Sequence, residues 1–406
     1  MISATLLPLL LIALTATPAD RWPAFRGAGD SLAAATQLPL EWSDDQGVAW
    51  QLPLTGYGQS SPVVWGDRVF VTAVDGESKE ELLVMCASVP HGTLEWTQRF
   101  KATQTTKLSD YVSRGAPTPA VDADRVYAFF ESGDLIALDH RGSQQWTRHL
   151  AREFGELRGN HGIGASLACS RDAIFVLVEH EGPSYLLALD KVSGKTRWKI
   201  DRPAKVSWTS PIVNESGSGS AEVIVGSAGT LEAFRVDDGK RLWWLSGLEG
   251  NTVPSPTVGA EHVVVGSTHV ASNIAVRRGH TGELSAEQIA WRSKDASSSF
   301  ASPLVYQDRV YFINRAGAAF CLDLATGRTL WTQRLAGSCW ASPVGAEGRV
   351  YFFGKDGVTT VVKAAATFEK LAINKLTIEG RVYGVAPVHG AFLLRTGKKL
   401  ICVGNP

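Results

Sequence analysis

A glycine followed four residues later by a tryptophan is the feature that most constrains how this 406-residue chain can fold. Segments 188–198 (ALDKVSGKTRW) and 321–331 (CLDLATGRTLW) show it most fully. The same step leads from Gly92 to Trp96, from Gly142 to Trp146 and from Gly239 to Trp243, and a longer turn separates Gly282 from Trp291. Because glycine tolerates the positive φ of a tight turn, each copy is typical of a strand, a turn and a new strand that carries a tryptophan. Five copies at one offset indicate a repeat architecture.

A second marker opens each repeat: a small or hydroxyl residue, a proline and an apolar run. It occurs at Ser61-Pro62, Thr118-Pro119, Ser210-Pro211, Ser255-Pro256, Ser302-Pro303, Ser342-Pro343 and Ala386-Pro387, and Ser166-Leu167 fills the one gap. These eight starts are 40 to 57 residues apart. Four short strands in each unit are the blade pattern of a β-propeller.

The two ends of the repeat region complement each other. The last unit stops after Cys402 without an outer strand, whereas the segment around Trp50 resembles an outer strand without a blade. Pairing them would hide two open sheet edges. We therefore predict an all-β, eight-bladed β-propeller of four-stranded antiparallel blades, the last of them closed by an N-terminal strand. Seven blades remain the alternative if the start at Leu167 or Pro387 is not a true blade.

The N-terminal residues predict export. Residues 1–19 hold a short apolar run followed by small residues, which is typical of a cleaved secretory signal peptide, although the absence of an early Lys or Arg leaves an uncleaved anchor as the alternative. We expect an extension over 20–45 and a single propeller domain over 46–406. The expected location is beyond the inner membrane, in the periplasm or outside the cell, with no transmembrane segment.

Charge and cysteine content exclude several function classes. Lys plus Arg equals Asp plus Glu at 40 each, so there is no basic field for nucleic acid. The five cysteines include no adjacent pair and no CxxC motif, so a metal or redox motif is absent. Cys86, Cys321 and Cys402 occupy a strand position where the other repeats have alanine, which favours buried structural thiols.

The Ala-x-Asp-x-x-x-Gly-x-x-x-Trp pattern resembles the repeat of pyrroloquinoline-quinone-type (PQQ-like) propellers over nearly all of residues 50–404. That superfamily includes quinoprotein dehydrogenases and the non-catalytic, BamB-like propeller lipoprotein of the bacterial outer-membrane β-barrel assembly machinery. The resemblance implies that the outer-strand tryptophans dock neighbouring blades. These are Trp50, Trp96, Trp146, Trp198, Trp243, Trp291 and Trp331.

The resemblance does not extend to the cofactor. In the quinoprotein dehydrogenases, PQQ lies between a tryptophan and a disulfide of adjacent cysteines, beside a calcium or lanthanide ion. This chain has no adjacent cysteines and no acidic residues at a recognisable metal-ligand spacing. We therefore expect no cofactor and no metal, with PQQ and calcium reserved for the alternative that the chain is an oxidoreductase.

Residues that precede the inner strands should gather at one mouth of the central channel, together with hairpins of the same face. The candidates for binding a ligand or partner are Arg114, His161, Lys205, Trp208, Phe300, Arg315, Trp340, Arg381 and Tyr383. This aromatic and basic set suits an anionic or planar ligand or an extended peptide. The competing interpretation is that the aromatic side chains merely plug the axis. A lone histidine such as His161, without a nucleophile, is more often a surface residue than a general base.

These observations favour a secreted, non-catalytic propeller that acts as a protein-binding or assembly scaffold in the cell envelope. The alternatives are a PQQ-dependent alcohol or sugar oxidoreductase with a divergent site, and a carbohydrate-binding propeller. We expect a monomer that holds a protein partner or a small ligand on the channel face.

Overall fold

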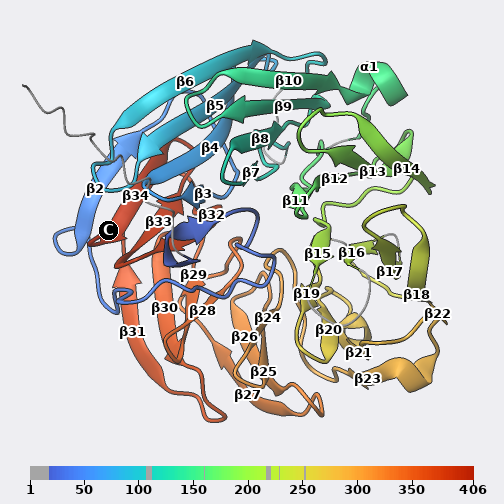
Figure 1. Cartoon of the computed structure of the whole chain (residues 1–406). Helices are drawn as coiled ribbons and strands as arrows, with labels where there is room; N and C mark the ends of the chain where they lie inside the picture. The colour runs from blue at the N-terminus through green and yellow to red at the C-terminus, as the bar shows by residue number, and fades with distance from the viewer. Residues whose placement is uncertain (1–17, 107–111, 160, 216–220, 228, 251–252) are drawn as a thin grey trace, which may run out of the picture.

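The computed structural model describes residues 18–106, 112–159, 161–215, 221–227, 229–250 and 253–406. Eight antiparallel β-sheets stand around a central axis like the blades of a propeller, and they follow one another around the ring in chain order (Figure 1). The predicted eight-bladed propeller is therefore confirmed, and the seven-bladed alternative is wrong, because the sheets that start after Leu167 and Gly384 are both complete blades. The predicted signal peptide falls on residues 1–19, of which 1–17 lie outside the described residues.

Each blade contributes four strands, numbered from the channel outward. Blade 1 contains β3 (Val63–Trp65), β4 (Arg68–Asp75), β5 (Glu81–Ser88) and β6 (Leu94–Lys101), with β1 (Arg21–Trp22) added at the channel edge of β3. Blade 2 contains β7 (Ala120–Val121), β8 (Arg125–Phe129), β9 (Asp134–Asp139) and β10 (Gln144–His149). Blade 3 contains β11 (Ala168–Cys169), β12 (Ala173–Val178), β13 (Ser184–Asp190) and β14 (Thr196–Arg202). Blade 4 contains β15 (Ile212–Asn214), β16 (Glu222–Ser227), β17 (Thr230–Arg235) and β18 (Arg241–Ser246).

The second half of the ring follows the same plan. Blade 5 contains β19 (Thr257–Val258), β20 (His262–Val265), β21 (Ile274–Arg277) and β23 (Ile289–Arg292), while β22 (Gly282–Glu283) leaves it to pair with β18. Blade 6 contains β24 (Leu304–Tyr306), β25 (Arg309–Ile313), β26 (Ala318–Asp323) and β27 (Thr329–Arg334). Blade 7 contains β28 (Val344–Ala346), β29 (Arg349–Phe353), β30 (Val358–Lys363) and β31 (Lys370–Lys375). The helical turns in the described part of the chain are η1 (Pro18–Asp20), α1 (Leu150–Phe154), η2 (Val270–Ser272) and η3 (Ala286–Gln288).

Blade 8 is closed by the N-terminal strand, as predicted. It contains β32 (Gly384–Val388), β33 (Ala391–Arg395), β34 (Lys399–Gly404) and β2 (Val48–Pro53), and Trp50 of β2 lies opposite Cys402 of β34. The start and the end of the chain thus share one sheet, visible as the blue strand beside the red ones in Figure 1. This pairing covers the edge of β34 that would otherwise be open.

The hydrophobic core lies between blades rather than on the axis. The middle strands are packed on both faces, so β12 (AIFVLV) is buried at all six positions. Outer strands have one face in solvent, and β2 alternates between half-buried and exposed residues. The two patterns explain why the sequence shows continuous apolar runs followed by a polar, tryptophan-bearing strand in each unit.

The glycine-to-tryptophan step joins neighbouring blades. The indole N–H of Trp198 donates to the Val236 carbonyl of the next blade at 2.9 Å, and the ring lies against Gly239. Equivalent N–H bonds lead from Trp50 to Val89, from Trp96 to His140, from Trp146 to Lys191, from Trp291 to Leu324 and from Trp331 to Ala365. A Cβ added at Gly239 would lie 2.8 Å from the Trp198 ring, so this glycine provides space for the preceding blade's tryptophan as well as a positive φ of 72°.

Two blade junctions depart from this rule. Trp243 is buried between blades 4 and 5, but its indole N–H donates to Glu222 of its own blade, and open space surrounds Gly282. Blade 7 has Ala372 where the other outer strands have tryptophan. There Trp42 of the N-terminal segment packs against Phe392, with ring centroids 6.1 Å apart, and its backbone N–H bonds to Asn374. Trp42 therefore occupies the junction of blades 7 and 8 in place of a blade tryptophan.

The hydroxyl residues of the second marker form a chain of hydrogen bonds around the channel. The backbone N–H of each donates to the side-chain hydroxyl of its counterpart in the next blade at 2.9 to 3.0 Å. The six bonds run from Ser61 through Thr118, Ser166, Ser210, Ser255 and Ser302 to Ser342. Ala386, at the eighth position, has no hydroxyl, so this chain of bonds ends between blades 7 and 8.

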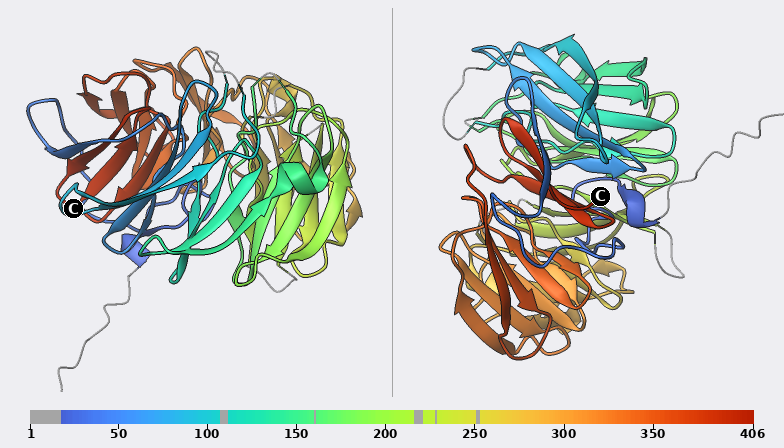
Figure 2. Two further views of the ribbon diagram at one scale, coloured as in Figure 1. Left: turned by 90° about the horizontal axis from the view of Figure 1, so that it is seen from above. Right: turned by 90° about the vertical axis from the view of Figure 1, so that its left-hand side faces the viewer.

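The N-terminal segment, residues 20–47, crosses the inner strands at their C-terminal ends. This mouth of the channel lies opposite the loops that precede the inner strands. Arg21 lies opposite Trp65 of blade 1, Pro23 accepts the Val121 N–H of blade 2, and Leu32 bridges to Gly345 of blade 7. The buried guanidinium of Arg26 donates to the Thr257 hydroxyl at 2.7 Å and to the Pro256 carbonyl at 2.7 Å. The segment thus covers this mouth of the channel, and Figure 2 shows η1 at the same face.

The described part of the chain contains no helix with the length and apolar character needed to cross a membrane. All five cysteines are free, and all except Cys169 are buried.

Candidate functional site

The loops that precede the inner strands place four aromatic rings in a row at the open mouth of the channel. Phe300 lies 5.1 Å from Trp340, Trp340 lies 5.7 Å from Tyr383, and Tyr383 lies 6.2 Å from Tyr57, all between ring centroids. The four residues come from the loops of blades 6, 7, 8 and 1, so they span half of the ring. We call this row the aromatic arc. All four of its residues are half-buried.

Two arginines flank the aromatic arc. The guanidinium of Arg381 lies 4.6 Å from the Trp340 ring centroid, and that of Arg114 lies 4.9 Å from the Tyr57 ring centroid. Both distances are within the range of cation–π attraction, which is worth about 0.5–1 kcal/mol at exposed sites. Guanidinium groups of this kind combine stacking on an aromatic face with N–H donors that suit an oxyanion.

A buried ion pair fixes the loop that carries Arg114. The ammonium of Lys79 donates to the Ser113 carbonyl at 3.0 Å and to Glu131 at 3.3 Å, and the Gly115 N–H donates to both carboxylate oxygens of Glu131. Burial raises the pKa of Glu131 above its ordinary value, while Lys79 opposes this by stabilising the carboxylate. The backbone on both sides of Arg114 is therefore tied to blades 1 and 2.

The centre of the arc is a pair of tyrosine hydroxyls. The hydroxyl of Tyr57 lies 2.7 Å from that of Tyr383, and one of the two donates to the other. Burial and this hydrogen bond raise the pKa of Tyr57 to about 12, so the phenol stays protonated at neutral pH.

A fully buried arginine lies below this pair. Arg395 of β33 is 0% exposed, and its guanidinium donates to the Thr396 carbonyl at 2.7 Å and more weakly to the Lys399 carbonyl at 3.3 Å. Burial lowers the pKa of Arg395 to about 9, which still leaves it cationic at neutral pH. Its charge interacts with the Tyr57 and Tyr383 phenols, so the centre of the arc lies in a positive field.

A second, smaller group lies across the mouth. The His161 ring lies 5.7 Å from the Trp208 ring, and the Trp208 indole N–H donates to the Gly162 carbonyl at 3.2 Å. Lys205 is exposed and lines a cavity of about 390 Å³ with Trp208 and Leu248.

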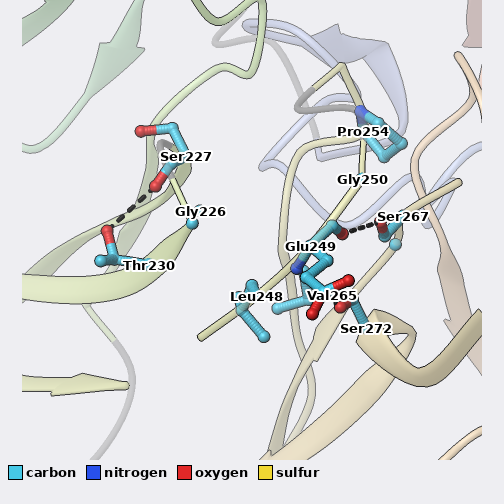
Figure 3. Close-up of a pocket in the computed structure, with 12 residues that line it drawn as sticks. Gly226, Ser227, Thr230, Leu248, Glu249, Gly250, Pro254, Val265, Ser267 and Ser272 are labelled. Atoms are coloured by element: carbon cyan, nitrogen blue, oxygen red, sulfur yellow. Dashed lines mark hydrogen bonds between the residues drawn. The ribbon is translucent and has the colours of Figure 1, made fainter. Parts of the chain in front are cut away.

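A narrow hollow adjoins this cavity between blades 4 and 5. Figure 3 shows Leu248 and Glu249 beside Ser267 of blade 5, with Ser227 and Thr230 of blade 4 opposite. The Ser267 hydroxyl donates to the Glu249 carbonyl and the Thr230 hydroxyl donates to the Ser227 carbonyl. The hollow measures about 20 Å³, enough for one water molecule but too small for an organic ligand.

The predicted site residues therefore fall into two groups and one outlier. Arg114, Phe300, Trp340, Arg381 and Tyr383 belong to or flank the aromatic arc, and His161, Lys205 and Trp208 form the second group. Arg315 is exposed on a blade 6 hairpin and is joined to the arc side only through its backbone N–H, which donates to Ser299. Two further mouth positions considered from the sequence, Asn160 and Asn251, lie outside the described residues.

Two carboxylates on the hairpins of this face, Glu131 and Glu179, are buried. Glu131 is paired with Lys79, and Glu179 is held by the guanidinium of Arg202 between blades 3 and 4. Each pairing follows from desolvation, because a buried carboxylate needs a cation and hydrogen bonds. The mouth is consequently more basic than the sequence suggested.

The residues present do not fit PQQ with its metal ion. Within the described residues, no group of three or more His, Cys, Asp or Glu side chains could hold a metal. Cys339 lies beside the mouth residue Trp340 but is buried and free, so it cannot supply half of an adjacent-cysteine disulfide.

Comparison with known proteins places this geometry in a family. The family model described as outer membrane protein assembly factor BamB matches residues 28–160, 157–320 and 286–369, which together exceed half of the chain. The chain belongs to this family. A curated relative, outer membrane protein assembly factor BamB of Shewanella oneidensis, is 26% identical over 239 residues, which is 55% of this chain. The alignment spans 57% of that relative's length.

Solved structures show the same fold at low sequence identity. BamB from Moraxella catarrhalis is 17% identical with a TM-score of 0.64, covering 87% of this chain and 96% of that one. A europium-containing methanol dehydrogenase is 12% identical with a TM-score of 0.61, covering 94% and 90%. A quinohemoprotein alcohol dehydrogenase from Comamonas testosteroni is 13% identical with a TM-score of 0.64, covering 96% and 81%. At these identities the likeness shows the propeller fold alone.

Sequence reasoning missed the parts that support the arc. The pairing of Tyr57 with Tyr383 joins positions 326 apart, and no local motif announces it. Arg395 follows an apolar strand and looks like an ordinary strand end. Lys79 offers one signal, because it sits at a positive φ of 56° in a hairpin of charged residues.

Proposed function

We propose that this propeller of the BamB family is a non-catalytic scaffold of the cell envelope that holds a protein partner on the open mouth of its channel. The observation that supports this most directly is the aromatic arc with its flanking arginines. Aromatic residues and arginine are enriched at the centres of protein interfaces, where they contribute most of the binding energy. The eight-bladed ring supplies a rigid support for such loops.

Assembly of outer-membrane proteins is the process in which we place this scaffold, because the matching family and the Shewanella relative carry that description. The proposal includes export by a cleaved signal over residues 1–19, a short extension over 20–45 and a single propeller domain over 46–406 that acts as a monomer in the periplasm. Mass spectrometry of the mature protein would test cleavage of the signal. Light scattering would give the mass of the particle in solution and test whether it is a monomer.

The decisive experiment is deletion of the gene in the native host, with the yield of folded outer-membrane β-barrel proteins as the readout. We expect the deletion to lower that yield and the full-length gene to restore it. A Trp340→Ala, Arg381→Gln double variant should fail to restore it, whereas Arg315→Gln, on the same face but outside the arc, should restore it fully. Restoration by the double variant would contradict the assignment of the arc.

We also propose that the scaffold works without a cofactor. Titration of the purified protein with PQQ, with and without calcium, should leave tryptophan fluorescence unchanged. Tight calcium-dependent quenching would favour the oxidoreductase alternative over the scaffold.

A further inference from the structure

Positive charge surrounds the tyrosine pair of the aromatic arc, because Arg114, Arg381 and Arg395 all act on its phenols. Among the described residues, no carboxylate oxygen lies within 4.0 Å of the guanidinium nitrogens of Arg395 or Arg381. The buried Arg395 Nε also has no hydrogen-bond partner in the described part of the chain. This contrasts with two other buried cations, Arg202, which binds Glu179 and Glu232, and Lys79, which binds Glu131. A fully buried guanidinium without an acid is unfavourable unless a negative group approaches it.

The tyrosine pair also has one hydrogen-bond donor to spare. Two protonated hydroxyls share a single mutual bond, so one O–H group is left to donate elsewhere. No other acceptor for either hydroxyl occurs among the described residues. A ligand oxygen placed against the pair would therefore gain an O–H donor that the protein itself does not use.

Space for such a ligand exists beside the pair. A cavity of about 310 Å³ lies between blades 8 and 1 and is lined by Tyr57, Arg114 and Lys398 among others. Its one acidic lining residue, Asp75, lies 4.0 Å from Arg99 on the outer side of blade 1. The lining is therefore dominated by cations and a phenol, and its volume suits one or two amino-acid side chains.

We propose that this cavity binds an acidic side chain of the protein partner, with the carboxylate held by Tyr57, Arg114 and Lys398. The inference rests on the proposed scaffold function and specifies the chemistry of its partner. Arginine presents a rigid fork of donors that matches the two oxygens of a carboxylate. The adjacent aromatic arc offers rings to the apolar neighbours of that acidic residue.

The field of the buried Arg395 adds to this preference without any contact. Because Arg395 is 0% exposed, it cannot touch the ligand, but its charge is poorly screened by water and acts on the tyrosine pair above it. Arg381, stacked on Trp340, extends the same field along the arc. An acidic residue flanked by aromatic residues is the peptide segment that these groups together fit.

The test uses the full mature chain and three probes: a terminally blocked hexapeptide with two glutamates between phenylalanines, its glutamine counterpart, and inorganic phosphate. By calorimetry at low ionic strength, we expect the glutamate peptide to bind at least about tenfold more tightly than the glutamine peptide. The preference should shrink in 1 M NaCl, where the screening length falls to about 3 Å. Phosphate should bind more weakly than the glutamate peptide, since it contacts none of the aromatic rings.

Variants separate the roles of the groups. Arg114→Gln should weaken binding of the glutamate peptide by about tenfold and leave the glutamine peptide unaffected. Tyr57→Phe keeps the ring and removes the O–H donor, so a loss of about two- to tenfold is expected. Arg315→Gln is the matched control and should change nothing. Lys398→Gln, outside the loop tied by the Lys79–Glu131 pair, covers the case in which Arg114→Gln fails to fold, and it should weaken the glutamate peptide and leave the glutamine peptide unaffected.

Equal affinity for the glutamate and glutamine peptides, no binding of either, or binding of phosphate alone would each refute the carboxylate site. The gene deletion answers the other question independently. Impaired assembly of outer-membrane proteins together with equal peptide affinities would refute only this inference, and a glutamate preference without an assembly defect would refute only the scaffold function.

Discussion

The docking of each outer-strand tryptophan on a glycine of the next blade leads to a sharp prediction for Gly194→Ala. Gly194 has a φ of 67°, and a Cβ there would lie 2.7 Å from the Trp146 ring. The left-handed conformation costs an alanine about 1–2 kcal/mol. Forcing the ring away from the added methyl costs about 1–3 kcal/mol more. The free energy of unfolding should therefore fall by about 2–5 kcal/mol.

Gly282→Ala is the control, because Gly282 is the corresponding glycine of the copy with the longer turn, has a φ of 78° and has no atom within 4 Å of an added Cβ. It should lose only the conformational part, about 1–2 kcal/mol. Guanidinium unfolding followed by circular dichroism would measure both values. If Trp146→Ala is combined with Gly194→Ala, the steric part should disappear in a double-mutant cycle. Equal losses for the two glycine variants would refute the view that the repeat glycine exists to accommodate the tryptophan.

Three further predictions concern the ring as a whole. Ser255→Ala removes the hydroxyl that accepts the buried Ser210 N–H, so it should lower the free energy of unfolding by about 1–3 kcal/mol. Ser246→Ala, at an exposed position, is the control and should change the free energy of unfolding by no more than about 0.5 kcal/mol. Similar losses for the two variants would contradict the role of the hydroxyl chain. Deleting residues 46–54 removes β2 and exposes β34, so the melting temperature should drop and aggregation should rise, and an unchanged melting temperature would count against closure of the ring by β2. Stability should also decrease as the pH falls from about 5 to 2. Hydrogen bonds from Arg197 and Ser193 lower the pKa of Asp190 to about 2, below its value in the unfolded chain. The stabilisation is therefore present above the unfolded pKa and is lost as the folded carboxylate is protonated. In Asp190→Asn the acid-dependent loss, measured by denaturant unfolding across that range, should be smaller, and an identical pH profile would show that this turn is not involved.

The repeat markers were sufficient to predict the ring because they report contacts that recur in every blade. The Gly-to-Trp step encodes the junction between neighbours. The hydroxyl before the proline accepts the N–H of its counterpart in the preceding blade, although this role became visible only in the structure. Even the closure by β2 could be inferred, since Trp50 repeats a pattern whose other strands are missing nearby.

What could not be predicted lies in contacts that occur once. Trp42 fills the junction at Ala372, and no repeat relates the two positions. The burial of Glu131 and Arg395 depends on loops from different blades, so their residue types alone could not predict it. The mouth residues were placed on one face by topology, yet their division into the aromatic arc and the His161–Trp208 group depends on side-chain packing that a single sequence does not reveal.

The pairing of β2 with β34 has a consequence for how the protein is made. Trp50 is synthesised among the first residues and Cys402 among the last, so the strand that completes blade 8 must wait unpaired while seven other blades are produced. Contacts between such distant positions carry a large loop-closure cost and form late. The β2 segment would therefore need protection from incorrect strand pairing until β34 has been made. We therefore expect the pairing of β2 with β34 to be the last step in closing the ring.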